Sequence, residues 1–115
     1  MLQQLQTLLN TTFPTAQITI SNGKLRMSEK NTFIGDVIIQ DKHTFVWFDQ
    51  IYVKTSEQRK GVGTTVLGAV VQASKAAGYT HIECRPTAGG ELHGLDFCQK
   101  NGFTDVGGGV WRLYS

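Results

Sequence analysis

Six consecutive residues, Gln58 to Gly63, combine two cations with two glycines. Arg59 and Lys60 supply positive charge. Gly61 and Gly63 lack the Cβ atoms that would hold a ligand away from the backbone amides. The apolar pattern that follows predicts a helix, whose first backbone N–H groups are unpaired and carry roughly half a positive charge. This combination favours a site for an anion such as phosphate.

This glycine pattern differs from the two best-known phosphate motifs. A P-loop needs Gly-Lys-Ser/Thr at a fixed spacing, which is absent here, and the dinucleotide fingerprint needs a third glycine. The alternative is an ordinary strand-to-helix turn with solubilising charges, because short motifs often match by chance.

The segments on either side of this loop have clear patterns. Residues 45–53 (FVWFDQIYV) are rich in aromatic and β-branched side chains, which favours a strand. Over residues 62–77 valines recur at helical spacing, and Gly78 stands where a helix end needs a left-handed residue. The loop therefore joins a strand to the start of a helix.

The rest of the chain alternates strand and helix patterns. Asn22-Gly23 is the strongest short hairpin signal, because both central residues of a type I′ turn need positive φ. A strand that follows a helical crossover should lie parallel to the strand before it. We therefore predict an α+β fold, a mixed and mostly antiparallel sheet flanked by helices. The predicted strands are 18–21, 24–27, 32–40, 44–53, 81–85, 103–106 and 110–114, with a turn at 41–42, and the predicted helices are a short one ending near Pro14, 62–77 and 91–101.

Length and charge restrict the function classes. A chain of 115 residues is expected to form one domain, residues 1–115. The net charge of +2 argues against a nucleic-acid or membrane partner, because the positive charge is local to the loop. The N-terminus lacks the pattern of a signal peptide, and no apolar run is long enough to span a membrane, so we expect a cytoplasmic protein.

Metal and disulfide chemistry are not expected from the cysteines. Cys84 and Cys98 do not form a spaced metal motif, and free thiols are the default in a cytoplasmic protein. His81, Glu83 and Arg85 alternate onto one strand face. A His81–Glu83 pair offers too few ligands for a metal site.

Gln58-Arg59-Lys60-Gly61-Val62-Gly63 matches the Q/R-x-x-G-x-G/A signature of the GNAT family of N-acetyltransferases, which the chain resembles. The family commonly has a strand ending in valine five residues before the Gln/Arg, as at Val53. Its second helix usually ends in Lys-x-Gly-Phe, as at residues 100–103. The resemblance extends from about Phe45 to the C-terminus. The N-terminal part is shorter than in the family, which implies an open acceptor groove, or one completed by a partner chain as in a homodimer.

The resemblance implies that acetyl-CoA is the co-substrate. Family members hold its pyrophosphate on the loop amides and its pantetheine arm in a cleft where the fourth and fifth strands splay apart. One amide of residues 51–53 would also stabilise the oxyanion, and which one stays open because the family's fourth strand often bulges at this point. The implied cofactor-binding residues are Ile51, Tyr52, Val53, Gln58, Arg59, Lys60, Gly61, Val62, Gly63 and Thr64.

The implied reaction is acetyl transfer to a primary amine of a small molecule, a protein lysine or an N-terminus, by direct attack in a ternary complex. Asp49 is the candidate base, because family members often place a carboxylate near this position. The alternative is an Asp49 that is simply solvated, and Glu83 is the second candidate. The acid is usually a tyrosine four residues before the glycine of Lys-x-Gly-Phe, where this chain has Cys98.

Cys98 and Glu91 depart from the family pattern. A thiol has a reference pKa of about 8.5, so Cys98 could protonate a thiolate, or it could be a buried apolar residue. Glu91 stands where the family often has an asparagine that contacts the cofactor. These departures leave a second hypothesis open: a non-catalytic acetyl-CoA-binding module that regulates a partner protein.

Overall fold

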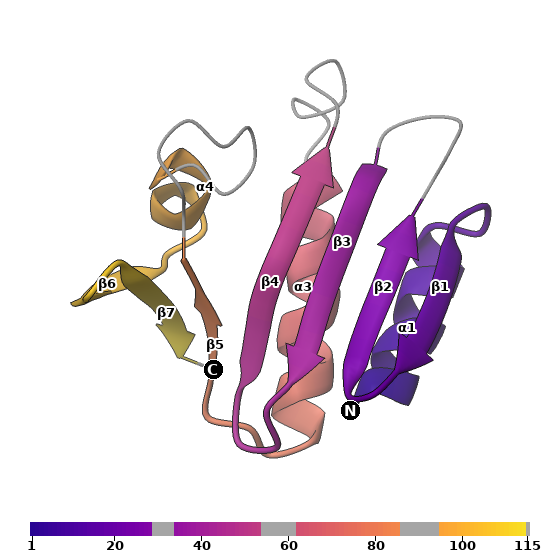
Figure 1. Ribbon diagram of the computed structural model, residues 1–115, viewed down its shortest axis with the longest axis horizontal. Coiled ribbons are helices and arrows are strands. Elements are labelled where there is room, and N and C mark those ends of the chain that lie inside the picture. The colour runs from indigo at the N-terminus through magenta and orange to yellow at the C-terminus, as the bar shows by residue number, and fades with distance from the viewer. Residues whose placement is uncertain (29–33, 54–61, 86–94, 115) are drawn as a thin grey trace.

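The computed structural model describes residues 1–28, 34–53, 62–85 and 95–114. These residues form an α+β fold with a seven-stranded sheet, which confirms the predicted class (Figure 1). The elements in chain order are α1 (Leu2–Thr12), β1 (Gln17–Ser21), β2 (Lys24–Ser28), β3 (Ile34–Asp41), β4 (Val46–Val53), α3 (Val62–Ala76), β5 (His81–Cys84), α4 (Leu95–Lys100), β6 (Thr104–Gly107) and β7 (Val110–Tyr114).

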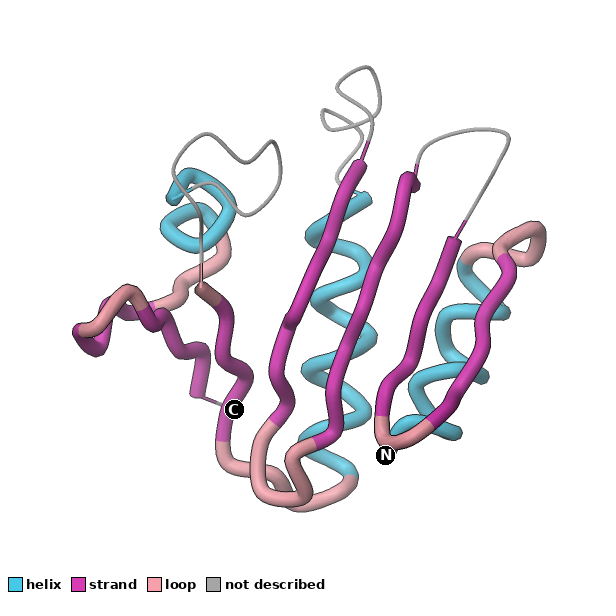
Figure 2. The backbone as a smooth tube through the Cα atoms, in the orientation of Figure 1, coloured by secondary structure: helices cyan, strands magenta, loops and turns pink. Residues whose placement is uncertain are grey.

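The strands lie in the order β1-β2-β3-β4-β5-β7-β6 (Figure 2). β4 and β5 are parallel, and the other neighbours are antiparallel. A helical crossover returns the chain to the same end of the sheet, so α3 sets the parallel pair, as the sequence predicts. The final hairpin places β7, not β6, against β5.

Local sequence signals fix the ends of several elements. Asn22 and Gly23 have φ values of 52° and 74°, the paired positive values of a type I′ turn. Gly78 follows α3 with φ of 76°, and the N–H of Tyr79 donates to the carbonyl of Ser74 at 2.9 Å. Gly78 thus ends the helix as predicted, because glycine adopts the left-handed conformation without strain, and α3 stops at Ala76, one residue before the predicted end.

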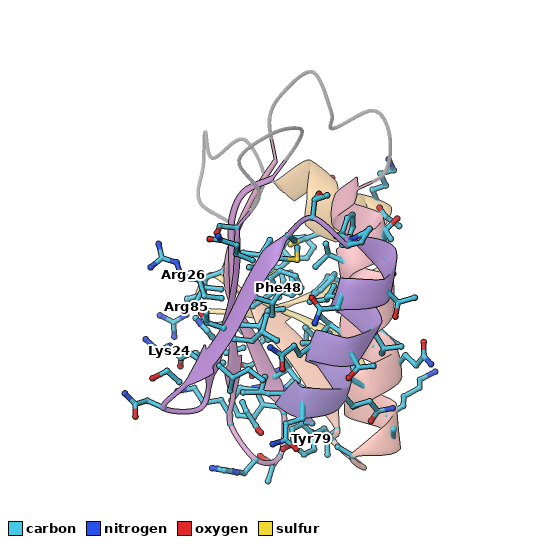
Figure 3. The ribbon with its side chains drawn as sticks, turned by 90° about the vertical axis from the view of Figure 1, so that its right-hand side faces the viewer. Lys24, Arg26, Phe48, Tyr79 and Arg85 are labelled. Carbon is cyan, nitrogen blue, oxygen red and sulfur yellow. The ribbon has the colours of Figure 1, made fainter. Side chains whose placement is uncertain are left out.

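One face of the sheet packs against α1 and α3 and forms the core (Figure 3). Leu5 and Leu9 of α1 and Val66 and Val70 of α3 are fully buried there. Phe48 of β4 is the largest of the fully buried side chains and lies between the sheet and the helices. Burial of apolar area from both layers supplies the main stabilisation of the fold.

The opposite face of the sheet carries polar and charged side chains. Lys24, Arg26 and Arg85 point away from the helices, as Figure 3 shows. Lys24 and Arg26 alternate along β2 with Leu25 and Met27, whose side chains are buried in the core. We call this surface the outer face. Within the described residues, no helix is both long and apolar enough to cross a membrane.

The predicted element bounds differ from the observed ones by a few residues. β4 begins at Val46 and not at residue 44, because the chain is still turning at residues 43–45, where the N–H of Lys42 donates to the carbonyl of Phe45 at 3.0 Å. His43, with φ of 69°, turns the chain between β3 and β4. β5 ends at Cys84 and α4 covers Leu95–Lys100, whereas residues 91–94 of the predicted helix lie outside the described part.

Tyr79 joins two turns at one end of the sheet. Its hydroxyl donates to Asp41 Oδ1 at 2.7 Å, and the same carboxylate accepts the N–H of His43. Burial, and then the bond to Asp41, raises the pKa of Tyr79 from 10.0 to about 12. The protonated tyrosine therefore stabilises the folded chain below pH 10.0, and this contribution disappears as the pH rises towards 12.

We expect Tyr79→Phe to lower the free energy of unfolding at neutral pH by about 1 to 2 kcal/mol, because a hydrogen bond to a carboxylate is lost. Urea unfolding of both proteins from neutral pH to pH 12 would test this. The difference between them should shrink above pH 10.0, since only the wild type carries the raised pKa. A difference that stays constant to pH 12 would contradict the assignment.

Candidate functional site

The parallel ladder between β4 and β5 is short and ends in the middle of β4. Its pairs are Val46 with Ile82, Trp47 with Glu83, and Phe48 with Cys84. β5 ends at Cys84, whereas β4 continues to Val53. The two strands thus diverge beyond their last pair, and Figure 1 shows the upper part of β4 standing apart from β5. This is the splayed pair that the family resemblance implies.

A β-bulge lies directly beyond that last pair. Ile39 of β3 faces Phe48, and its neighbour Ile38 faces Gln50, so Asp49 is an extra residue in β4. The bulge interrupts the regular alternation of residues between the two faces of the sheet along β4. Bulges re-aim backbone and side-chain groups and occur often beside active sites. The structure places Asp49 through its backbone only, so its predicted role as base stays a prediction.

The first turn of α3 contacts the end of α4. Thr64 Oγ1 donates to Asn101 Oδ1 at 3.1 Å, although the two residues are far apart in sequence. Gly63 is buried in the same turn, and Thr64 is exposed. Figure 1 shows that α3 begins at the end of the sheet where β4 ends. The first N–H groups of α3, which have no partner within the helix, therefore point towards the end of the sheet at which β4 and β5 have separated.

Cys98 lies on α4 and is completely buried. Its Sγ is 3.0 Å from Sγ of Cys84, and both cysteines are free thiols. Because Cys84 is the partner of Phe48, the two sulfurs lie where the parallel ladder ends. The hydrogen bond between them lowers the pKa of Cys98, against the effect of burial, and the same bond together with burial raises that of Cys84.

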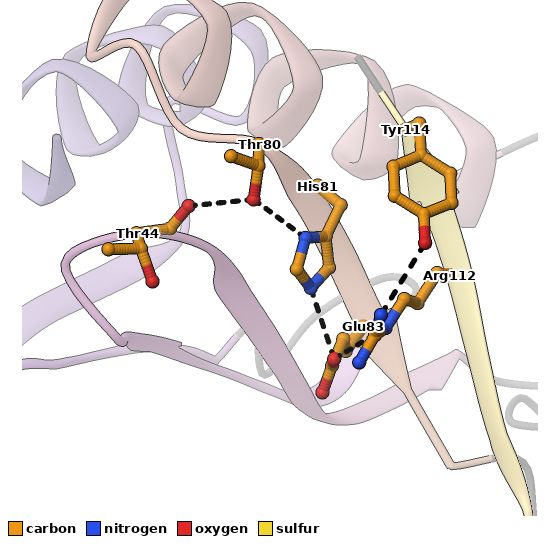
Figure 4. A network of polar contacts seen from close by, with 6 residues as sticks. All are labelled: Thr44, Thr80, His81, Glu83, Arg112 and Tyr114. Carbon is orange, nitrogen blue, oxygen red and sulfur yellow. Dashed lines mark hydrogen bonds and ion pairs between the residues drawn. The ribbon is translucent and has the colours of Figure 1, made fainter. Parts of the chain in front are cut away.

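A polar network occupies the outer face over β5 and β7 (Figure 4). Glu83 is only 7% exposed, and its Oε1 accepts from Arg112 Nε at 2.7 Å and bonds His81 Nε2 at 3.0 Å. His81 Nδ1 bonds the hydroxyl of Thr80 at 2.7 Å, and Tyr114 lies beside Arg112. The network confirms that His81 and Glu83 share one strand face.

Glu83, the second candidate base, is thus held by two partners on a single carboxylate oxygen. Sequence reasoning missed Arg112, although a strand at residues 110–114 paired with β5 would place alternate residues on the face of Glu83. The described residues contain no group of three or more histidine, cysteine or acidic residues able to hold a metal ion.

Arg85 and Trp47 form a second contact on the outer face. The Arg85 guanidinium lies 5.2 Å from the centre of the Trp47 ring, a distance at which a cation and an aromatic ring attract. Trp47 is paired with Glu83 in the ladder, so this contact borders the end of the β4–β5 pairing. It leaves an aromatic ring and a charge next to the place where the strands diverge.

The structure describes the predicted cofactor residues to different extents. Thr64 and Gly63 are fully described in α3, and Cys98 lies one turn before the Asn101 that contacts Thr64. One end of the sheet therefore carries the N-terminus of α3, Cys98 and the end of the β4–β5 ladder. Ile51, Tyr52, Val53 and Val62 are placed by their backbone only, whereas Gln58, Arg59, Lys60, Gly61 and Glu91 lie outside the described residues.

A family model described as "Acetyltransferase (GNAT) family" matches residues 16–103 of the sequence. No curated protein gave a match. Among solved structures, the chain is similar to Tetrahymena GCN5, with 16% identity, a TM-score of 0.62, and coverage of 98% of this chain and 85% of that one.

Two further solved structures share the fold. The PaiA N-acetyltransferase from Thermoplasma acidophilum, in complex with coenzyme A, is 19% identical with a TM-score of 0.60, covering 98% of this chain and 69% of that one. A GNAT family acetyltransferase from Elizabethkingia anophelis with acetyl-CoA bound is 16% identical with a TM-score of 0.57, covering 96% of this chain and 83% of that one.

Proposed function

The chain belongs to the acetyltransferase (GNAT) family, and on that premise we propose that it transfers an acetyl group from acetyl-CoA to a primary amine. The acceptor is a small molecule, a protein lysine or an N-terminus, and the amine attacks the thioester directly in a ternary complex. One observation carries this proposal. The parallel ladder of β4 and β5 ends at Phe48 and Cys84, and the two strands diverge towards the end of the sheet where α3 begins.

We infer acetyl-CoA binding from the groups at that end of the sheet, the backbone of β4 and the start of α3. The pantetheine arm is an extended amide chain, which can bond to the backbone of β4 beyond Phe48 as an added strand would. That assigns Ile51, Tyr52 and Val53 to the arm. The pyrophosphate lies on the amides of residues 58–64, where the start of α3 and the side chains of Arg59 and Lys60 supply positive charge.

Asp49 acts as the base in this proposal. An amine must be neutral to attack a carbonyl, so a group at the site or a water chain must take its proton. The bulge at Asp49 supports this role, because this residue has no partner in the β3–β4 ladder and follows directly on the last β4–β5 pair. A backbone N–H of β4 next to the bulge stabilises the carbonyl oxygen as it gains charge.

Cys98 acts as the acid that protonates the departing thiolate of coenzyme A. Its position supports the role, since α4 contacts the first turn of α3 through Asn101 and Thr64. Its burial against Cys84 favours the alternative of a structural residue. The same observation favours the second candidate function, a non-catalytic acetyl-CoA-binding module that regulates a partner protein.

The binding proposal is tested by melting the protein with coenzyme A or acetyl-CoA. A ligand that binds the folded state raises the melting temperature as its concentration increases. If neither compound changes the melting temperature, both functions fail. If acetyl-CoA binds but no thiol is released with small amines, polyamines or peptides, the regulatory function is favoured.

Substitution of the two proposed catalytic residues separates their roles. We expect Asp49→Asn to lower kcat by about 10²- to 10⁴-fold, the usual contribution of a general base, and the loss should be smaller at high pH, where the free amine is abundant. Cys98→Ala should lower kcat with little change in the affinity for acetyl-CoA. Thiol release and calorimetric binding measure the two effects. Unchanged turnover in either variant would remove that residue from the mechanism.

The proposed setting is the cytoplasm, with no nucleic-acid or membrane partner. Two copies of the chain could form a homodimer in which each completes the acceptor groove of the other. Size-exclusion chromatography with light scattering, with and without acetyl-CoA, measures the molar mass and thus the oligomeric state. A monomer at all working concentrations would argue for an open groove, which suits a protein acceptor.

A further inference from the structure

Cys84 and Cys98 form a buried pair of thiols that acetyl transfer does not require to be together. They come from different elements, β5 and α4, and their sulfurs are 3.0 Å apart. A disulfide bond is about 2.05 Å long, so an approach of about 1 Å would join them. The exposed fractions are 3% for Cys84 and 0% for Cys98, so the protein shields both residues from bulk solvent.

The fold holds this pair in place from both sides. Cys84 is paired with Phe48 on β4 and with Trp111 on β7, so its backbone is fixed within the sheet. Cys98 lies in the middle of α4, and the N–H of Phe103 bonds the carbonyl of Cys98 at 2.9 Å. Phe103 is itself buried in the core. The 3.0 Å separation of the two sulfurs is therefore a feature of the native packing.

We propose that Cys84 and Cys98 are an oxidation site that closes to an intramolecular disulfide when the folded protein meets hydrogen peroxide. In the first step the sulfur of Cys98 attacks one peroxide oxygen, the O–O bond breaks, and water leaves after protonation, giving a sulfenic acid. In the second step the sulfur of Cys84 attacks that of Cys98 and expels a second water. Two thiols are oxidised and one peroxide is reduced to two waters.

Cys98 is the first nucleophile because it lies on the short helix α4, and the hydrogen bond from Cys84 favours its thiolate, which is the reactive form. Access to the sulfur comes through α4, which spans only Leu95–Lys100. A helix this short has little stability of its own and depends on its tertiary contacts. Local opening of such an element costs less than global unfolding, and peroxide is small enough to enter.

The disulfide would fix α4 to β5 across the residues between positions 84 and 98. It would remove the free thiol at position 98 and constrain the unfolded chain by closing a loop. We expect the oxidised protein to melt roughly 10 °C above the reduced one, from the stabilisation typical of a loop of this length. The effect does not depend on acetyl-CoA or on any acceptor amine.

The test uses the full chain treated with hydrogen peroxide, then denatured, alkylated at remaining thiols and measured by intact mass. The expected product has lost two hydrogen atoms, takes no alkyl group and yields a linked peptide containing Cys84 and Cys98. Dithiothreitol should restore two alkylated thiols and the lower melting temperature, whereas it would not reverse methionine oxidation. Two alkylated thiols after peroxide, sulfinic acids without a cross-link, or a disulfide between two chains would each overturn the proposal.

A Cys84→Ser variant identifies the first step, because the serine hydroxyl keeps a hydrogen-bond donor beside Cys98. Peroxide should leave it with one sulfenic acid at position 98, which a dimedone probe traps, and with no rise in melting temperature. Trapping at no site in this variant would overturn the assigned order of attack. If the variant does not fold, dimedone added to the wild type during a short peroxide pulse gives the same information, because label at position 84 alone would contradict it.

Discussion

Replacing Arg59 and Lys60 together by alanine is expected to weaken coenzyme A binding by roughly 10- to 100-fold. Charge-assisted hydrogen bonds to phosphate are each worth about 1.5 to 3 kcal/mol, and part of that is lost to solvent screening near the surface. Since these side chains precede the start of α3, they add to the positive end of that helix. The amides of Gly61 and Gly63 remain in the variant, so binding should be weakened and not abolished.

Calorimetric titration at two salt concentrations measures this effect. The matched control is Lys24→Ala with Lys75→Ala, which removes the same charge from exposed residues on β2 and on the far end of α3. The control should bind coenzyme A as the wild type does. Equal weakening in both variants would show a general electrostatic effect, and unchanged binding in the loop variant would remove the loop from the site.

Short-range chemistry made much of the fold predictable. Asn22-Gly23 specifies a type I′ turn because both residues tolerate positive φ, and the observed values are 52° and 74°. The valines of α3 recur at helical spacing, and Gly78 ends the helix. A helix between two strands then requires a parallel pair, which is β4 with β5. Each of these inferences depends on a few neighbouring residues.

The family resemblance implies a bulge in the fourth strand, and the sequence of β4 itself contains a signal for the one at Asp49. With strict alternation from the buried Phe48, Gln50 would register with the core side and Ile51 with the outer face. An extra residue at Asp49 reverses this, so that Ile51 pairs with Val37, whose side chain is buried. Two adjacent polar residues inside an apolar strand are thus a reason to expect a bulge.

The two side-chain clusters at the site depend on contacts that the sequence pattern does not encode. Glu83 meets Arg112 only because β7 lies between β5 and β6. Cys98 meets Cys84 only because α4 folds back over the core side of β5. Pairings of this kind follow from strand order and helix placement, which hydrophobic periodicity leaves open. In these clusters the candidate base Glu83 and the candidate acid Cys98 have partners that the sequence did not predict.

A second large effect is expected for Phe48→Ala, which should lower the free energy of unfolding by about 3 to 5 kcal/mol. Phe48 is 2% exposed, lies in the core and belongs to the last β4–β5 pair. The loss is a large fraction of the roughly 5 to 15 kcal/mol that stabilises a typical domain, so a considerable part of the variant should be unfolded at physiological temperature. Urea unfolding followed by circular dichroism measures it.

Two variants make this measurement specific to packing at the end of the ladder. Phe48→Leu keeps most of the buried volume and should cost less than about 1.5 kcal/mol. Val106→Ala removes an apolar side chain that is 42% exposed on β6 and should change stability by no more than about 0.5 kcal/mol. Similar losses for the alanine variants at positions 48 and 106 would contradict the placement of Phe48.

If Phe48→Leu folds fully but binds acetyl-CoA more weakly, the shape of the core at position 48 also sets how β4 and β5 diverge, because the bulge at Asp49 begins at the next residue.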